Sequence, residues 1–319
     1  MTGGTGFIGS RVIKRLRARG DEVVALVRTP SKTTELLDQG VDLVQGDLSS
    51  DDAIRRGIDG VDGVFHIGAV YKVGVPKTEH AAMYDANVGG TQRILDAAEA
   101  SGVQRIVYVS TGNVFGDTKG QIVDETYQRQ MDDGFLSYYD ETKYRSHELV
   151  KERIAKGAPI VIAQPGVTYG PGDHSEIGNM IDQMRSGKLK MRMFPASRFN
   201  FVYVDDVAEG IVLAYDKGRI GESYLLGGEV ASMDDLFTKV SQRLGKKPPR
   251  MALPPAMARA SAPLGPVIGP LMGFPPNMRE LVKTSDVTIT FRDDKARREL
   301  GYRGRSFDEG LDQTVTRSQ

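Results

Sequence analysis

A glycine-rich loop, Thr-Gly-Gly-Thr-Gly-Phe-Ile-Gly, stands almost at the start of the chain, at residues 2–9. Such a loop joins the first β-strand of a dinucleotide-binding unit to its first helix. Its glycines let the backbone come close to a pyrophosphate, and the helix N-terminus offers free N–H groups. An amphipathic stretch at 7–19, a helix stop at Gly20 and an apolar run at 23–27 follow it. This order favours a phosphate-binding loop over the alternative, a Gly-rich N-terminal tail.

The strand that should precede this loop is not in the sequence, because Met1 alone stands in front of Thr2. In a doubly wound sheet this strand lies in the middle, so its loss would leave unpaired backbone groups on both neighbours. We therefore expect the first β-strand to be missing and the sequence to start several residues late.

Composition narrows the class of protein. With 319 residues, the chain can form one α/β domain with a smaller lobe. Lys and Arg total 42, as do Asp and Glu, so no overall charge attracts nucleic acid. There is no cysteine, and four histidines lack ligand spacing, so we expect neither a disulfide nor a metal site. Without a signal peptide or a membrane-spanning apolar run, we expect a soluble, cytoplasmic protein that acts on a small molecule.

Short β-rich runs alternate with helical patterns through the first half, which predicts a parallel sheet wound on both faces. The predicted strands are residues 22–27, 42–45, 63–66, 105–110, 160–163, 200–204 and 223–226. The predicted helices are residues 7–19, 31–37, 51–57, 78–100, 135–156 and 205–216. After about residue 165 we expect loops and short helices.

This pattern divides the chain into a dinucleotide-binding domain and a substrate lobe. The domain spans residues 1–165, with returning segments near 200–227, and the lobe is formed by 166–199 and 228–319. Residues 247–276 are rich in Pro, Gly, Ala and Met, which is typical of an irregular lobe.

Tyr139 and Lys143 form a Tyr-x-x-x-Lys pair within a predicted helix. Positions i and i+4 share one face, so the phenol and the ammonium project into the same space. A nearby cation lowers the pKa of a phenol, which can then exchange a proton with a substrate oxygen. Tyr138 has Thr142 at i+4, so the register selects Tyr139. The alternative is an ordinary surface Tyr and Lys, because this spacing is common by chance.

Ser110 and Thr111 end the β-branched strand before Gly112. Carboxyl ends of parallel strands line the ligand crevice, where a hydroxyl can bind a substrate carbonyl or alcohol oxygen. Alternatively, these hydroxyls satisfy local backbone groups.

Together these motifs resemble the extended short-chain dehydrogenase/reductases, often called the NAD-dependent epimerase/dehydratase family, and especially their dihydroflavonol reductase-like branch. The resemblance covers nearly the whole chain. The segments that carry it are residues 2–9, 46–48, 64–69, 87–91, Tyr139 with Lys143, 164–172, 201–208 and 295–302. It implies a Rossmann fold, an NAD(P)-dependent enzyme and a homodimer formed through the helices at 78–100 and 135–156.

The resemblance also implies roles for individual residues. Tyr139 matches the acid/base, Lys143 matches the residue that lowers its pKa and binds the nicotinamide ribose, and Thr111 matches the hydroxyl that orients the substrate, with Ser110 a weaker candidate. The expected cofactor-binding residues are Gly3, Gly6, Phe7, Ile8, Gly9, Arg28, Lys32, Asp47, Leu48, Gly68, Ala69, Asn87, Tyr139, Lys143, Pro165 and Val167. For Asp47, a simple turn role after Gly46 is the alternative.

The end of the strand at 22–27 favours NADP over NAD. NAD-selective sites hold an acid there for the ribose 2′-OH, but this chain has Arg28 and Lys32, which can bind a 2′-phosphate. The dihydroflavonol reductase-like branch that the chain resembles also carries an arginine here and uses NADP. Stacking of Arg28 on the adenine of NAD is the alternative.

Three functions remain in competition. They are an NAD(P)-dependent ketone or alcohol oxidoreductase, a nucleotide-sugar epimerase or dehydratase with tightly bound NAD, and a non-catalytic NAD(P) sensor. Gly112 and Asn113 replace the acidic pair of the family's sugar dehydratases, and Phe199 and Asn200 stand where an arginine clamps the diphosphate. Asn179, in contrast, matches the sugar enzymes.

The apolar segments 251–258 and 263–276 suit a hydrophobic substrate, or fill the lobe's own core. We favour the oxidoreductase.

Overall fold

The computed structural model describes residues 1–252, 280, 283 and 286–316, the Lys32 side chain excepted. Its main sheet is parallel, with the order β2-β1-Thr2-β3-β4-β6-β10. The strands are β1 (Val24–Val27), β2 (Asp42–Gln45), β3 (Gly63–His66), β4 (Arg105–Val109), β6 (Ile160–Pro165) and β10 (Ser223–Leu226). All the predicted strands of this sheet are therefore present.

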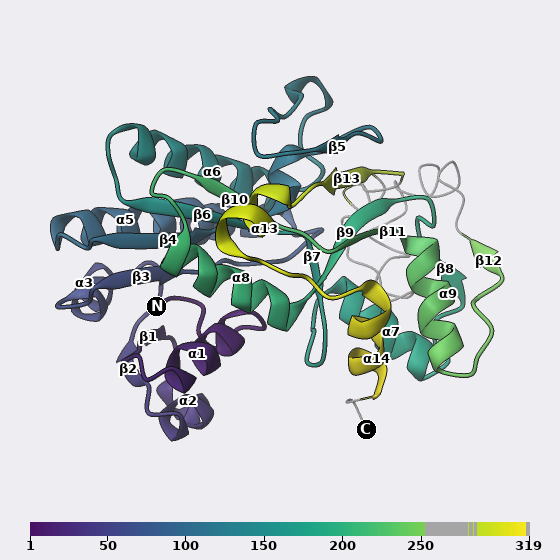
Figure 1. Cartoon of the computed structure of the whole chain (residues 1–319), viewed down its shortest axis with the longest axis horizontal. Helices are drawn as coiled ribbons and strands as arrows, with labels where there is room; N and C mark the ends of the chain where they lie inside the picture. The colour runs from purple at the N-terminus through teal and green to yellow at the C-terminus, as the bar shows by residue number, and fades with distance from the viewer. Residues whose placement is uncertain (253–279, 281–282, 284–285, 317–319) are drawn as a thin grey trace.

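The first two residues occupy the central position of this sheet. Thr2 forms parallel bridges to Leu26 of β1 and His66 of β3, and its amide donates to the Phe65 carbonyl at 3.0 Å. The Leu26 amide donates to the Met1 carbonyl at 3.0 Å. Figure 1 shows the start of the chain between β1 and β3. The sheet is thus continuous through Met1 and Thr2, at the place where sequence analysis expected a missing strand.

Helices cover both faces of the main sheet, as Figure 1 shows. On one face lie α1 (Gly9–Ala18), α8 (Val204–Lys217) and α13 (Asp294–Leu300), packed on residues such as Val107 and Val161. On the other lie α3 (Asp51–Ile58), α5 (Gly90–Ala100) and α6 (Tyr138–Ala155), packed on residues such as Ile106 and Ile160. Successive strand residues point to opposite faces, so β-branched runs feed both cores.

The helix predicted at 78–100 is interrupted by a wider turn. It begins with a short 3-10 turn (Lys77–Glu79) and α4 (His80–Tyr84), passes through a π-helical segment (Asp85–Gly89), and continues as α5. A π turn shifts the backbone bonding by one residue, and such turns recur at functional sites. The helix predicted at 31–37 is a 3-10 turn (Pro30–Lys32) followed by α2 (Thr34–Asp38).

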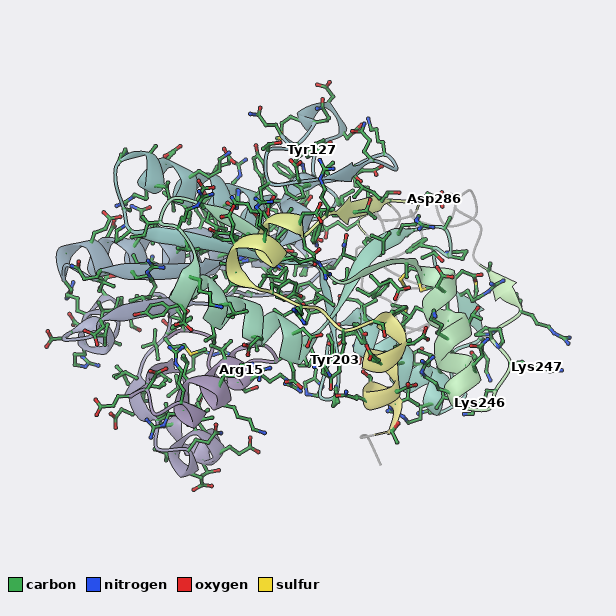
Figure 2. The ribbon with its side chains drawn as sticks, viewed as in Figure 1. Arg15, Tyr127, Tyr203, Lys246, Lys247 and Asp286 are labelled. Atoms are coloured by element: carbon green, nitrogen blue, oxygen red, sulfur yellow. The ribbon has the colours of Figure 1, made fainter. Side chains whose placement is uncertain are left out.

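A second, mixed sheet builds the lobe, which Figure 1 shows beside the main sheet. Its order is β11-β9-β13-β5, and β7 also pairs with β9. The strands are β5 (Ile122–Val123), β7 (Val167–Tyr169), β9 (Arg198–Tyr203), β11 (Glu229–Ser232) and β13 (Thr288–Phe291). Tyr203, labelled in Figure 2, lies where β9 runs directly into α8, so Val204 begins a helix rather than ending the predicted strand.

Helices α7 (Glu176–Arg185), α9 (Met233–Arg243) and α14 (Phe307–Thr316), with the two-stranded β8 (Met191–Arg192) and β12 (Met251–Ala252), complete the described part of the lobe. Sequence analysis predicted this region only as loops and short helices. The segment at residues 247–276 lies mostly outside the described residues. No helix in the described part of the chain is long and apolar enough to cross a membrane.

Candidate active site

The predicted site residues gather at the carboxyl edge of the main sheet. Gly6 is exposed at the tip of the phosphate loop, Gly68 and Ala69 follow β3, Thr111 follows β4, and Val167 follows β6. Carboxyl ends of adjacent parallel strands form the ligand crevice of an α/β sheet. The fold therefore brings these distant segments to one edge.

The phosphate loop leaves no room for side chains where its backbone turns. Gly3 has a φ of +73°, and a Cβ there would lie 2.7 Å from the Gly68 nitrogen. A Cβ on Gly9 would lie 2.0 Å from the Gly3 oxygen. Within the described residues, the amides of Phe7 and Ile8 have no protein acceptor. Free amides at the start of α1, in a cradle that a Cβ would fill, fit a dinucleotide pyrophosphate.

The expected adenosine end of the crevice lies at β1 and β2. Arg28 directly follows β1 and is exposed. Asp47 Oδ1 accepts the Ser49 amide at 2.9 Å, and the Ser49 bonds, with the charge of Arg28, hold the pKa of Asp47 below its usual value. Asp47 therefore makes the turn contacts that sequence analysis gave as its alternative role. Its neighbour Leu48 is half-buried. The Lys32 side chain lies outside the description.

The two strand-end hydroxyls, of Ser110 and Thr111, differ in burial and in hydrogen bonding. Ser110 is buried, and its Oγ lies 3.0 Å from His147 Nδ1. Thr111 Oγ1 accepts the Asn113 amide at 3.2 Å, which leaves the hydroxyl proton free to be donated. Thr111 is also the more exposed of the two. The geometry therefore favours Thr111 over Ser110 as a donor to a substrate oxygen.

Tyr139 and Lys143 lie one turn apart on α6 and are 9% and 4% exposed. Lys143 Nζ donates to the Val109 carbonyl at 3.0 Å and lies 3.4 Å from the Tyr108 hydroxyl, so the ammonium is directed at the end of β4. Burial lowers the pKa of Lys143 to about 8.

The pKa of Tyr139 corrects one expectation. Burial, together with the charges of Asp140 and Glu176, raises the pKa of Tyr139 well above its usual value. The pattern Tyr-x-x-x-Lys predicted a lowered pKa. The reason for the difference is that loss of water around the phenolate outweighs the influence of an ammonium bound to β4. Burial therefore favours the protonated form of the Tyr139 phenol.

A buried ion pair supports the wall beside Tyr139. Arg129 and Asp140 have side chains 2% and 3% exposed, and two N–O distances of 2.8 and 2.6 Å join them. Asp140 also accepts the Leu136 amide at 2.9 Å, while Arg129 donates to the Gly134 carbonyl at 2.9 Å. The pair therefore ties the loop before α6 to the first turn of the helix that carries Tyr139.

A cavity of about 720 Å³ opens in front of Tyr139. Its described walls are mostly apolar and come from α7, α9, the segment before β9, and β13. The large apolar residues among them are Leu136, Ile177, Met180, Leu189, Met191, Met193, Phe194, Phe199, Met233, Val287 and Ile289. Glu176, Lys188 and Lys190 also line it and are exposed. A cavity of this size and character suits a small organic substrate.

A bridge between the two sheets crosses this cavity. The Tyr71 ring stands edge-on to the Tyr139 ring with centroids 4.8 Å apart, and the Tyr71 hydroxyl donates to Glu176 at the start of α7. Glu280 adds a second link, accepting the Gly74 amide at 2.9 Å and the Tyr138 amide at 3.3 Å. Side chains from the lobe are thus bound directly to the loop and helix around Tyr139.

The remaining predicted residues occupy supporting positions. Asn87 is 2% exposed; its Oδ1 accepts the Val70 amide at 2.7 Å and its Nδ2 donates to Thr142 Oγ1 at 2.9 Å. It therefore holds the loop after β3 against α6 rather than facing the crevice. Pro165 is buried at the end of β6, and Val167 lines the cavity.

The positions that sequence analysis compared with sugar-nucleotide enzymes have structural partners. Asn200 is buried and exchanges bonds of 2.8 and 2.9 Å with the backbone of Phe291. A Cβ on Gly112 would lie 2.5 Å from the Phe291 ring, so an acidic side chain does not fit there. Among the described residues, no arginine lines the cavity, although Asn179 does.

Sequence reasoning missed most of the cavity wall. It placed the apolar lining at 251–258 and 263–276, which lie almost entirely outside the described residues. The described methionines of the wall come instead from residues 180–193 and 233. The cluster of methionines between residues 180 and 193 was the available signal.

Comparison with known proteins agrees with this geometry. The sequence profile of the NAD dependent epimerase/dehydratase family matches residues 1–227. A provisionally named dihydroflavonol 4-reductase of Synechocystis sp. is 31% identical, over 99% of this chain and 92% of its own. A 4-hydroxy-2-methyl-3-oxo-4-farnesyl-3,4-dihydroquinoline-1-oxide ketoreductase of Stigmatella aurantiaca is 31% identical, over 98% and 94%.

Among solved structures, a double mutant of the dTDP-glucose 4,6-dehydratase DesIV of Streptomyces venezuelae, with NAD bound, is 26% identical with a TM-score of 0.81, over 98% of this chain and 94% of its own. The chain belongs to the NAD dependent epimerase/dehydratase family, the NAD-binding extended short-chain dehydrogenase/reductases.

Proposed function

We propose that the chain is an NAD(P)-dependent oxidoreductase that interconverts a ketone and an alcohol on a largely apolar substrate. The observation that carries this proposal is the position of Tyr139, which lines a cavity of about 720 Å³ with methionine-rich walls. Two relatives are, by their names, a dihydroflavonol 4-reductase and a ketoreductase, which supports the same class of reaction.

When bound in the proposed site, the nicotinamide of the cofactor would supply or accept the hydride at the substrate carbon. Tyr139 supplies the proton to the substrate oxygen in the direction of reduction, a role that burial of the phenol favours. Thr111 donates a hydrogen bond to the same oxygen through its free hydroxyl and keeps its proton. Lys143 lies at the end of β4, within the crevice edge where the nicotinamide ribose is expected.

We further propose NADP as the preferred cofactor. Arg28 is exposed at the end of β1, and no carboxylate stands beside it on that strand. A guanidinium there binds a 2′-phosphate in a way that an acid cannot. The cofactor domain then comprises residues 1–165 with returning segments near 200–227, and the substrate lobe comprises 166–199 and 228–319.

The first test identifies the nucleotide. The purified protein is denatured and the released nucleotide is measured by mass spectrometry, followed by NADPH and NADH titration of the nucleotide-free protein. Preference for NADPH and an exchangeable cofactor support the proposal. Stoichiometric NAD retained through purification contradicts it and favours a nucleotide-sugar epimerase.

Two variants test the roles of named residues. We expect Tyr139→Phe to lower turnover of a hydrophobic ketone by about 10²- to 10⁴-fold with nucleotide binding unchanged. Tyr138→Phe is the matched control, because this neighbour stacks on His80 instead, with ring centroids 3.6 Å apart. Arg28→Asp should reverse the preference for NADPH. Full activity of Tyr139→Phe, or an unchanged preference in Arg28→Asp, removes the corresponding assignment.

A nucleotide-sugar epimerase is the second candidate, because Asn179 lines the cavity and DesIV, by its name, acts on dTDP-glucose. Turnover of nucleotide sugars, rather than of hydrophobic ketones, would favour it. A homodimer formed through α5 and α6 is also proposed. Light scattering that gives a monomer at micromolar concentration contradicts the dimer.

A further inference from the structure

A buried histidine lies between the phosphate loop and α5. His66 ends β3 and is 1% exposed. Its Nδ1 lies 2.7 Å from Oγ1 of Thr2, which begins the phosphate loop, and its Nε2 lies 3.0 Å from Oγ1 of Thr91 on α5. Both ring nitrogens are therefore engaged, and by residues of two different elements.

The partners of the two threonines determine the tautomer. The Thr91 hydroxyl donates to the Asn87 carbonyl at 2.6 Å, so its oxygen must accept a proton from His66 Nε2. The Gly68 amide donates to Thr2 Oγ1 at 3.0 Å, so the Thr2 hydroxyl proton is free for His66 Nδ1. Each donor then meets one acceptor only if the imidazole is neutral and carries its proton on Nε2.

The same chain of hydrogen bonds continues to α6. The Asn87 carbonyl lies in the π-helical segment, and Ser146 Oγ lies 2.8 Å from this carbonyl and 2.8 Å from the Thr142 carbonyl. The Asn87 side chain donates to Thr142 Oγ1 at 2.9 Å. Thr142 and Ser146 lie on the same helix as Tyr139 and Lys143. An unbroken path thus runs from the phosphate loop to the helix of the predicted acid/base.

We propose that His66 is a positioning residue that fixes the phosphate loop relative to α6, through its Nε2-protonated tautomer. The two ends of a dinucleotide are expected at these two elements, so their spacing sets how well the cofactor fits both at once. The inference rests on the cofactor-binding part of the proposed function and does not depend on which substrate reacts. Failure to reduce ketones would leave it untouched.

The test removes hydroxyls without removing volume. Thr91→Val deletes the acceptor for His66 Nε2, and Thr91→Ser keeps it, so the two variants are a matched pair. NADPH and NADH affinities are measured by fluorescence titration without substrate. We expect Thr91→Val to weaken the preferred cofactor about tenfold, which corresponds to about 1.4 kcal/mol. Thr91→Ser should stay within about twofold of the parent, since its hydroxyl can take the same two bonds.

A double-mutant cycle tests whether His66 couples Thr2 to Thr91. Thr2→Val removes the donor to His66 Nδ1 at the other end of the ring. If His66 couples the two ends, the combined Thr2→Val/Thr91→Val variant loses less affinity than the product of the single losses. Independent losses, or unchanged affinity in Thr91→Val with a lowered unfolding midpoint, overturn the proposal, because they show a role in stability alone.

An imidazole spectrum of the parent protein gives a readout that does not depend on cofactor affinity. Long-range ¹H–¹⁵N spectra of the parent, with the His66 signal assigned by its loss in His66→Asn or by elimination, should show a neutral ring protonated on Nε2 throughout about pH 5–8. In Thr91→Val the ring should become a mixture of tautomers. A parent ring protonated on Nδ1, or one that titrates in this range, contradicts the proposal.

Discussion

Removal of the Asp140 carboxylate tests the buried ion pair behind the active-site wall. Asp140→Asn leaves the Arg129 guanidinium in the interior without its counter-charge, because both side chains are only 2–3% exposed. Breaking such a pair costs about 3–5 kcal/mol. Arg129 keeps its bond to the Gly134 carbonyl at 2.9 Å, so we expect a loss near the lower limit, about 3 kcal/mol.

The assay is urea unfolding followed by circular dichroism, with two comparison variants. Glu141→Gln removes the adjacent carboxylate, whose partner Arg145 is half exposed, and should cost less than about 1 kcal/mol. The double variant Arg129→Met/Asp140→Leu replaces both charges and should be more stable than Asp140→Asn. The reasoning is refuted if Asp140→Asn costs no more than Glu141→Gln.

Two further predictions concern pH and the phosphate loop. Burial lowers the pKa of His66 and of His147 to about 3, so the unfolded chain binds more protons below pH 6.5. Their stabilisation is complete above pH 6.5 and falls by about 1.4 kcal/mol per pH unit for each histidine as the pH drops. Unfolding free energies measured from pH 7 to 5 should show this slope, and a flat profile contradicts it. Gly9→Ala places a Cβ 2.0 Å from the Gly3 oxygen and should abolish nucleotide binding, whereas Gly57→Ala on α3 meets nothing closer than 4.0 Å and should leave binding unchanged. Equal affinities in a nucleotide titration of the two variants would show that the loop does not hold the cofactor.

The sequence predicted the main sheet well because each strand has a local cause. The runs Gly-Val-Phe-His at 63–66 and Arg-Ile-Val-Tyr-Val at 105–109 are almost entirely buried, and short buried runs of this kind are typical of parallel strands. The lobe was poorly predicted because its strands are short and paired across distant segments. Residues 288–291, Thr-Ile-Thr-Phe, favour a strand locally, but their pairing with Arg198 and Phe199 on one side and with β5 on the other joins segments far apart in the sequence.

The candidate site, like the fold, was predicted only where a local sequence pattern determines it. The Tyr139 and Lys143 register follows from the helix period alone, and the structure places both in the buried face of α6. The direction of the Tyr139 pKa shift could not be predicted from the helix period. It depends on the water that the loop at 67–76 excludes and on Glu176 of α7. Burial is a property of the assembled fold, and no local spacing encodes it.

That pKa bears on the direction of the proposed reaction. A phenol whose pKa lies well above 10 is protonated at neutral pH and cannot withdraw a proton from an alcohol without help, but it can donate one to an oxygen that gains negative charge. Reduction of a ketone creates such an oxygen next to Tyr139. The Lys143 ammonium, with a pKa of about 8, adds positive charge at the same edge of the sheet. A raised Tyr139 pKa therefore favours its role as the proton donor in reduction, and the rate of alcohol oxidation should increase as the pH rises.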